Sequence, residues 1–299
     1  MENFNRLNDK YFKFLFANPD YKDLLIGFVN DVLDNTPKNV ERLPPVVDLV
    51  YSNREAVPQS ALDKTPRFDV MARTFDNRKL HIEVQVAYDP YLLQRLMNYA
   101  SRSYAGDTHQ GEPYSSVQIV FITLLNYNLF PDSEDWYELH RMINVATGAW
   151  RLRSMEFHFI DISKLRAKMI KEHAWPKTGL EHWLYYLGSI GGKKNMETIA
   201  KEDSRVNKMI KLENIFREDP GLFAAYTDWE FEKKLYDATL RYAAIQDEDE
   251  RKELDNISAL VNFIERGCTT LPKAAALLGM TEAEFKAKMA KYNIKIDNA

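Results

Sequence analysis

The chain has 299 residues, of which 45% are hydrophobic and 12% are aromatic. This amount of apolar material is enough for a large buried core and excludes a mainly disordered chain. With 40 Lys and Arg against 44 Asp and Glu, the net charge is only −4, so any contact with nucleic acid must come from a local basic patch.

A single cysteine, Cys268, excludes a disulfide scaffold and a zinc site built from several thiolates. One free thiol is typical of a reducing compartment, so the cytoplasm is the expected location. Residues 1–16 carry Asn and Asp where a secretion signal would be apolar. The most apolar stretch, residues 117–125, is too short to span a bilayer, and we expect no membrane contact.

The first predicted elements are two helices within residues 9–33. Apolar residues recur there every three or four positions, and the Asn18-Pro19 pair interrupts the pattern. Five prolines between residues 37 and 66 then exclude a long helix, while the β-like run 46–51 predicts one strand.

Strands and one helix follow up to about residue 163. Residues 67–74 and 79–86 predict two strands that are joined by a turn at 75–78. Residues 90–104 predict a helix, and residues 117–125 are apolar enough for a strand buried on both faces. The helix has an expected buried stripe of Leu92, Leu93, Leu96, Met97 and Ala100. Two further strands are predicted at 136–144 and 155–162.

From residue 164 onward only helices are predicted. We therefore expect an α/β region over residues 1–165 and an all-helical region over residues 166–299. Near the C-terminus, two short helices are predicted around Gly279, with Thr281 as the N-cap of the second.

Charge is divided unevenly within the helical region. Residues 164–211 hold eleven Lys and Arg against five Asp and Glu, whereas residues 213–255 hold six against thirteen. The basic stretch includes Lys193 and Lys194, which follow two glycines. Either this stretch contacts DNA phosphates, or it pairs with the acidic stretch within one chain or across a dimer.

Three polar residues on the two predicted strands point to metal chemistry. Glu83 and Gln85 lie two apart on a strand and so project from one face, with Val84 turned into the core. A hairpin through residues 75–78 would bring Asp69 beside them. Two carboxylates and an amide oxygen form a hard-oxygen site suited to Mg²⁺ or Mn²⁺, which can activate water against a phosphodiester.

An Asp followed by a strand with Glu-x-Gln resembles the PD-(D/E)xK nuclease superfamily. The flanking residues narrow the resemblance to the Rpn family of recombination-promoting nucleases and transposases, over roughly residues 5–165. This resemblance rests on five segments that occur in the same order along the chain: NDKYFKFLF at 8–16, RFDVMAR at 67–73, HIEVQ at 81–85, QRLMNYASRSY at 94–104 and GEPYSSVQIVFI at 111–122. The resemblance implies a restriction-endonuclease-like mixed sheet flanked by helices, and a bacterial, Mg²⁺-dependent DNA endonuclease linked to recombination or mobile elements.

The resemblance also implies roles for single residues. Asp69 and Glu83 would hold the metal, and Asp9 would be a further carboxylate ligand, unless it is only the N-cap of its helix. The superfamily usually has Lys where this chain has Gln85. A neutral amide cannot act as a general base, so Gln85 would position the water and activation would fall to the metal or another residue.

Basic and aromatic residues near this site are candidates for binding DNA. Arg95 and Tyr99 lie four apart on one helix face and could meet a phosphate, or they could serve packing and salt bridges. Arg67 would share the face of Asp69 if the strand is regular. Lys193 and Lys194 would extend the basic surface.

Two other functions remain open from the sequence. Gln85 and the near-neutral net charge are compatible with a nuclease-fold protein that binds DNA, or assembles, without efficient cleavage. A transposase that performs strand transfer is the other alternative. Self-association into a homo-oligomer is a further expectation.

Overall fold

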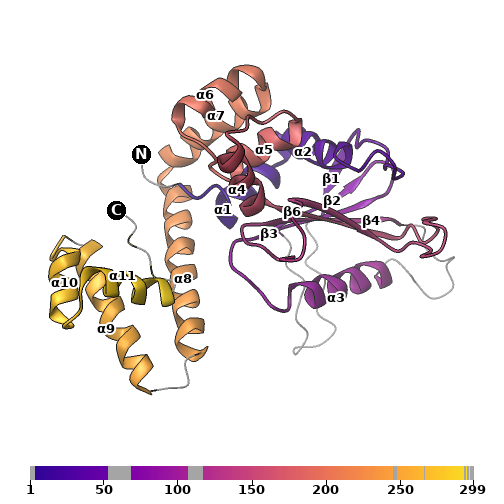
Figure 1. Ribbon diagram of the computed structural model, residues 1–299. Helices are drawn as coiled ribbons and strands as arrows, with labels where there is room; N and C mark the ends of the chain where they lie inside the picture. The colour runs from indigo at the N-terminus through magenta and orange to yellow at the C-terminus, as the bar shows by residue number, and fades with distance from the viewer. Residues whose placement is uncertain are drawn as a thin grey trace. The chain divides into compact units, whose positions relative to one another are not determined.

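The computed structural model describes residues 4–52, 69–106, 117–244, 248–265 and 267–292, together with Ile294 and Ile296. A mixed six-stranded sheet with helices is followed by a region of helices only, as the sequence predicts (Figure 1). The chain divides into two compact units, Met1–Trp229 and Glu230–Ala299.

The sheet has the strand order β1-β2-β3-β4-β6-β5. Its strands are β1 (Leu49–Tyr51), β2 (Val70–Thr74), β3 (Lys79–Gln85), β4 (Ile119–Leu125), β5 (Tyr137–Arg141) and β6 (Met155–Asp161). The central strands β3, β4 and β6 run parallel, and the pairs β1–β2, β2–β3 and β5–β6 are antiparallel. Each strand predicted from the sequence is present, mostly with shorter bounds.

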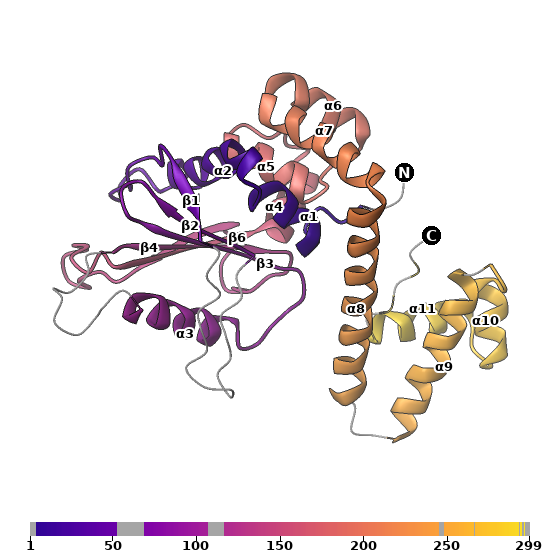
Figure 2. The ribbon, with the colours of Figure 1, turned by 180° about the vertical axis from the view of Figure 1, so that it is seen from behind.

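Strand β4 is buried along its whole length because both faces of the sheet are covered. Val120, Ile122 and Leu124 belong to the larger hydrophobic core, on the face covered by the N-terminal helices. Figures 1 and 2 show these helices and α4 and α5 on one side of the sheet, with α3 on the other. The helices are α1 (Asp9–Phe16), the 3-10 turn η1 (Pro19–Tyr21), α2 (Lys22–Asp34), α4 (Ile162–Glu172) and α5 (Gly179–Leu187).

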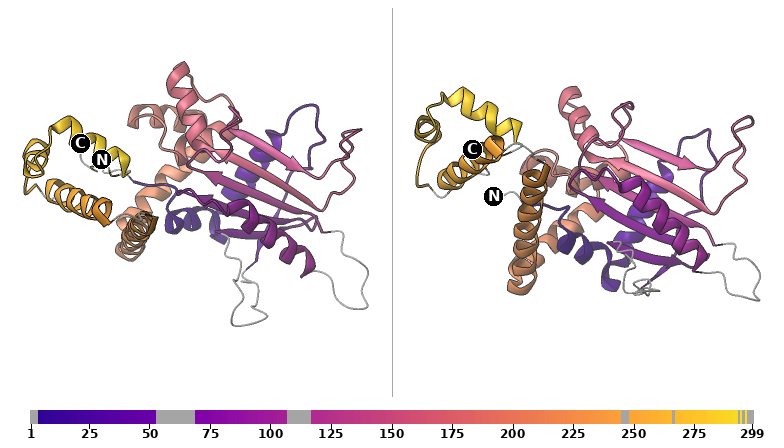
Figure 3. Two further views of the ribbon diagram at one scale, coloured as in Figure 1. Left: turned by 60° about the horizontal axis from the view of Figure 1, so that its bottom comes forward. Right: turned by 90° about the horizontal axis from the view of Figure 1, so that it is seen from below.

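Helix α3 (Leu92–Ala105) crosses the opposite face, as Figure 3 shows from two directions. Its buried residues are Leu92, Leu96 and Ala100, which pack with Phe121 of β4. The prediction that Leu93 and Met97 are also buried is wrong, because they are 41% and 53% exposed. They lie at the rim of α3, where they line a small groove toward β5 and β6 instead of the core.

Helices after the sheet extend the same hydrophobic core. Helices α6 (Lys193–Glu202) and α7 (Ser204–Glu218) contribute Ile199 and Phe216 to it. The long helix α8 (Pro220–Ala244) begins in the first unit, where Tyr226 joins this core. The expected domain boundary at residue 165 stays a prediction.

The second unit has its own small core. Helices α9 (Glu248–Glu265), α10 (Leu271–Leu277) and α11 (Glu282–Lys291) pack around buried residues such as Ile257 and Phe285. Thr281 caps α11 in a reciprocal pair of hydrogen bonds with Glu284, as predicted. Within the described residues, no helix is long and apolar enough to cross a membrane.

Candidate functional site

The β2–β3 hairpin sets Asp69 across from Glu83. Val70 at the start of β2 pairs with Ile82 of β3, so the preceding Asp69 lies opposite Glu83. The turn is closed by a hydrogen bond from Thr74 N–H to Arg78 O, and Asn77 adopts a left-handed conformation (φ 68°) that asparagine tolerates. The predicted strand-turn-strand arrangement is therefore confirmed.

Asp69 is held between β3 and α1. Its Oδ2 accepts a hydrogen bond of 2.7 Å from Val84 N–H. Its carboxyl group also shares a hydrogen bond with the carboxyl group of Asp9, the first residue of α1. Asn8, and not Asp9, is the N-cap of α1, because the Asn8 side chain accepts from Lys10 N–H. The helix thus leaves Asp9 free of a capping role and brings it to Asp69.

The two carboxyl groups differ in their affinity for a proton. Burial, followed by the hydrogen bond to Asp9, raises the pKa of Asp69 well above its usual range. Burial also opposes the charge on Asp9, but hydrogen bonds with Asp69 and with Lys13 outweigh it and lower the pKa of Asp9. Lys13 Nζ lies 2.6 Å from Asp9 Oδ1 and 3.8 Å from Asp69 Oδ1. The pair therefore carries less negative charge than two free carboxylates.

Glu83 belongs to a neighbouring cluster on the α3 face of the sheet. Its Oε1 accepts hydrogen bonds from Arg95 of α3, at 2.6 Å, and from the amide of Gln85. Its Oε2 is buried and has no hydrogen-bond partner among the described residues. Burial raises the pKa of Glu83, and Arg95 only partly offsets this effect.

Arg95 connects the cluster to the loop before α3. Besides Glu83, its guanidinium contacts the carboxylate of Asp89. Tyr99 lies one turn further along α3, close enough to Arg95 and Glu83 for its charge state to depend on them. Arg95 thus forms the salt bridges that were the alternative to a phosphate contact.

Three further residues were predicted to bind DNA: Lys193, Lys194 and Arg67. Lys193 and Lys194 are exposed at the start of α6, away from β3 in the sequence and on a different element. Arg67 lies outside the described residues.

The oxygen donors fit a small divalent cation. Mg²⁺ commonly takes one or two protein carboxylates and completes its coordination with water and substrate phosphate. The Asp9–Asp69 pair supplies two such groups, and Glu83 Oε2, in the cluster on the α3 face, is a third carboxylate oxygen without a hydrogen-bond partner among the described residues. Across the described residues, no group of three or more His, Cys, Asp or Glu side chains converges closely enough to hold a metal ion unaided. Water or substrate oxygens would have to complete the site.

Two features of this region were missed by sequence reasoning. Lys13 is one; its position four residues after Asp9 on one helix face was the available signal. The other is the set of arginines that line one cavity together with Asn126, among them Arg166, because no local sequence pattern connects them.

The family model described as PD-(D/E)XK nuclease family transposase matches residues 6–272 of the chain. No curated protein and no solved structure matches this chain. The matched segment contains Asp9, Asp69, Glu83 and Gln85 and extends through the helices to the start of α10.

Proposed function

Because the chain belongs to the PD-(D/E)XK nuclease family transposases, we propose that it is a metal-dependent endonuclease that hydrolyses DNA phosphodiester bonds during recombination or transposition. The observation that carries the proposal is the half-buried Asp9–Asp69 pair, together with the buried Glu83, which lies across the hairpin from Asp69. Such a concentration of acidic oxygens is costly in a fold unless a cation or a proton compensates it.

Asp9 and Asp69 would hold Mg²⁺, or Mn²⁺ in its place, and Glu83 would offer its unpartnered Oε2. When bound, the cation would supply an acidified water molecule and stabilise the charge that develops on the phosphate. Asp69 is fixed for this role by the Val84 N–H, and Glu83 by Arg95 and Gln85. The carboxylates are thus held by the backbone and by neighbouring side chains before substrate arrives.

Lys13 would supply the positive charge that Gln85 lacks. Its ammonium contacts Asp9 and lies within 3.8 Å of Asp69. From there it can attract a substrate phosphate and keep Asp9 ionised. Gln85 would orient water through its amide oxygen while its amide nitrogen donates to Glu83.

Cleavage of supercoiled plasmid tests the proposed function. The wild-type protein should produce nicked or linear DNA with Mg²⁺ or Mn²⁺ and none in EDTA. Glu83→Gln keeps the shape of the side chain and should abolish cleavage. A wild-type protein that binds DNA but never cuts it in either metal would contradict the proposal.

A DNA-binding protein with little cleavage activity is the second candidate. The observation that favours it is the salt bridge between Arg95 and Glu83, which neutralises a carboxylate that the metal would need. Arg95→Gln separates the two candidates, because it should raise metal-dependent cleavage if the salt bridge limits activity. Strand transfer would be recognised by joined products from DNA ends that carry a free 3′-hydroxyl. Self-association also stays a prediction.

A further inference from the structure

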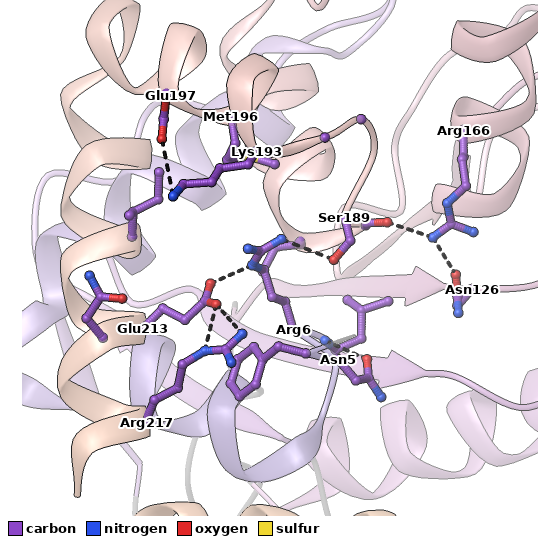
Figure 4. A pocket seen from close by; sticks show the side chains of 18 residues that line it. Asn5, Arg6, Asn126, Arg166, Ser189, Lys193, Met196, Glu197, Glu213 and Arg217 are labelled. Atoms are coloured by element: carbon purple, nitrogen blue, oxygen red, sulfur yellow. Dashed lines mark hydrogen bonds and ion pairs between the residues drawn. The ribbon is translucent and has the colours of Figure 1, made fainter. Parts of the chain in front are cut away.

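A cavity of about 910 Å³ lies beside the candidate site, at the carboxyl ends of the central strands (Figure 4). Asn126, which directly follows β4, is part of its wall, and its backbone N–H donates to the carbonyl oxygen of Gln85 at 2.9 Å. Arg166 comes from α4, the helix that follows β6. In sheets of this kind, ligands commonly bind at this edge.

Four cationic side chains line the cavity, against two carboxylates, Glu197 and Glu213. They come from four different segments of the chain and are Arg6, Arg166, Lys193 and Arg217. Figure 4 shows Arg6 between Ser189 and Glu213, and Arg166 directed toward Asn126. The lining therefore carries an excess of positive charge.

The carboxylates do not neutralise this excess. Glu213 is shared, because it accepts from Arg6 and from Arg217, each at 2.7 Å. The hydrogen bonds of Arg166 go to two neutral oxygens, the side chain of Asn126 at 3.2 Å and the carbonyl of Gly188 at 2.9 Å. Burial lowers the pKa of Arg166, which means that its charge is poorly compensated. An anionic ligand would complement this wall.

A glycine-rich turn fixes another side of the cavity. Gly191 has φ +80°, and a Cβ there would lie 2.1 Å from the hydroxyl of Tyr185, so only glycine fits. Gly192 and Lys193 follow, both in the lining, where α6 begins without a side-chain cap. The N-terminus of α6 adds positive potential to a site whose positive charge already comes from the arginines.

We propose that this cavity binds the terminal phosphate, with its nucleotide, of a DNA strand that lies in the active site. Arginine and backbone N–H groups are the usual ligands of phosphate, and the volume is in the range of about 300–1,000 Å³ that holds small-molecule ligands. Phe4 and Met196 contribute apolar atoms to the lining. The choice of DNA as the source of this phosphate rests on the proposed function, because it assumes that a DNA strand lies at Gln85.

Fluorescence anisotropy in EDTA tests the proposal without cleavage. Three short oligonucleotides are compared, with a 5′-phosphate, with a 3′-phosphate and with hydroxyls at both ends. One phosphorylated form should bind the full-length protein about tenfold more tightly than the hydroxyl form. Equal binding of all three forms would overturn the DNA-end proposal. Saturable binding of free thymidine monophosphate in that case would assign the cavity to free nucleotides.

Two substitutions at Gly192 provide a matched pair. A Cβ there meets nothing within 4 Å, so both Asp and Asn fit, and both are good N-cap residues. Gly192→Asp places a negative charge in the cavity and should abolish the preference for phosphate, whereas Gly192→Asn should keep it. A preference that survives in Gly192→Asp would overturn the proposal. Because EDTA prevents cleavage, the preference is measured whether or not the protein proves to be a nuclease.

Discussion

Asp9 and Asp69 hold their carboxyl groups in direct hydrogen-bond contact, and Lys13 forms its close ion pair with only Asp9. Two carboxylates at this separation cannot both stay ionised without compensation, since like charges disfavour each other's ionisation. Burial and the contact with Asp9 raise the pKa of Asp69, so the pair favours a compensating charge, either a proton or a divalent cation. The pair is therefore the most specific chemical feature of the chain.

Asp69→Asn should separate cleavage from stability. Asparagine can still accept from Val84 N–H and donate to Asp9, so the melting temperature should change little. If Asp69 holds the metal, loss of its carboxylate should lower the plasmid cleavage rate by at least about 100-fold. Cleavage at the wild-type rate would show that Asp69 does not hold the metal.

Lys13→Gln tests whether Lys13 supplies the positive charge that Gln85 lacks. Removal of its charge from the Asp9–Asp69 pair should slow cleavage by about tenfold or more. Lys10→Gln is the control, because Lys10 is exposed and its amino group lies 3.8 Å from Asp9. Equal effects of the two substitutions in single-turnover assays would reduce Lys13 to a general electrostatic role.

At the residue scale, the sequence predicts contacts within the hairpin better than contacts across the fold. Asp69 and Glu83 are connected by a short turn, so strand periodicity was sufficient to set them opposite each other. The approach of Asp9 was expected only from the family resemblance, because no local rule relates residues 60 positions apart. The salt bridge of Arg95 with Glu83 depends on how α3 packs over the sheet, which the pattern left open.

At the element scale, β5 and β6 are joined by a buried polar network. Glu156 is fully buried; its Oε2 accepts from Arg141 at 2.9 Å, and its Oε1 lies 2.8 Å from His158 Nε2. His158 Nδ1 lies 2.9 Å from the hydroxyl of Tyr137. Burial opposes the charge on Glu156, but its bonds with His158 and Arg141 outweigh this and lower its pKa. The network fixes the edge strand to the sheet.

Glu156→Gln should destabilise the protein by about 3 kcal/mol at pH 7, because it leaves the buried Arg141 without its counter-charge. The folded-state pKa of Glu156 lies below the usual 4.5, so the ionised carboxylate stabilises the fold above pH 4.5 and this contribution is lost as the pH falls further. Urea denaturation between pH 7 and pH 4 should show the difference shrinking below pH 4.5. Glu134→Gln, at an exposed position before β5, is the control, and a pH-independent difference would contradict the account.

The positions of the helices and strands were predictable from the sequence, whereas the faces that they bury were less so. Apolar spacing located α1, α2, α3 and the continuous apolar run of β4. It overestimated the buried stripe of α3, because Leu93 and Met97 have the right spacing but lie beyond the sheet surface that α3 covers. Burial of a helix face depends on the width of its partner, and the spacing of residues does not contain that information.

At the scale of the whole molecule, a net charge of −4 gives no general attraction to DNA, so binding depends on where cations gather. Part of the basic stretch 164–211 is already paired: Arg205 contacts Asp31 and Asp203, and Lys208 contacts Asp23. The exposed start of α6 is less compensated, since among the residues that the structure describes Lys193 forms a single ion pair, at 3.9 Å with Glu197.

Replacement of Lys193 and Lys194 together by alanine should therefore weaken DNA binding similarly for unrelated sequences. The slope of log affinity against log salt should fall by about one for each DNA phosphate that the variant no longer neutralises. Gel-shift titrations at two salt concentrations measure both quantities. If affinity is unchanged while sedimentation shows altered self-association, the basic stretch serves assembly instead of DNA.

Mn²⁺ binding, monitored by electron paramagnetic resonance, shows whether the acidic residues at the β2–β3 hairpin hold the catalytic cation. The wild-type protein should bind Mn²⁺ in a saturable manner, and Mg²⁺ should displace it. Asp69→Asn and Glu83→Gln should each weaken this binding by about tenfold or more, whereas Asp20→Asn, at an exposed position, should not. Absence of Mn²⁺ binding to the wild-type protein, or binding that both active-site substitutions leave unchanged, would contradict the account.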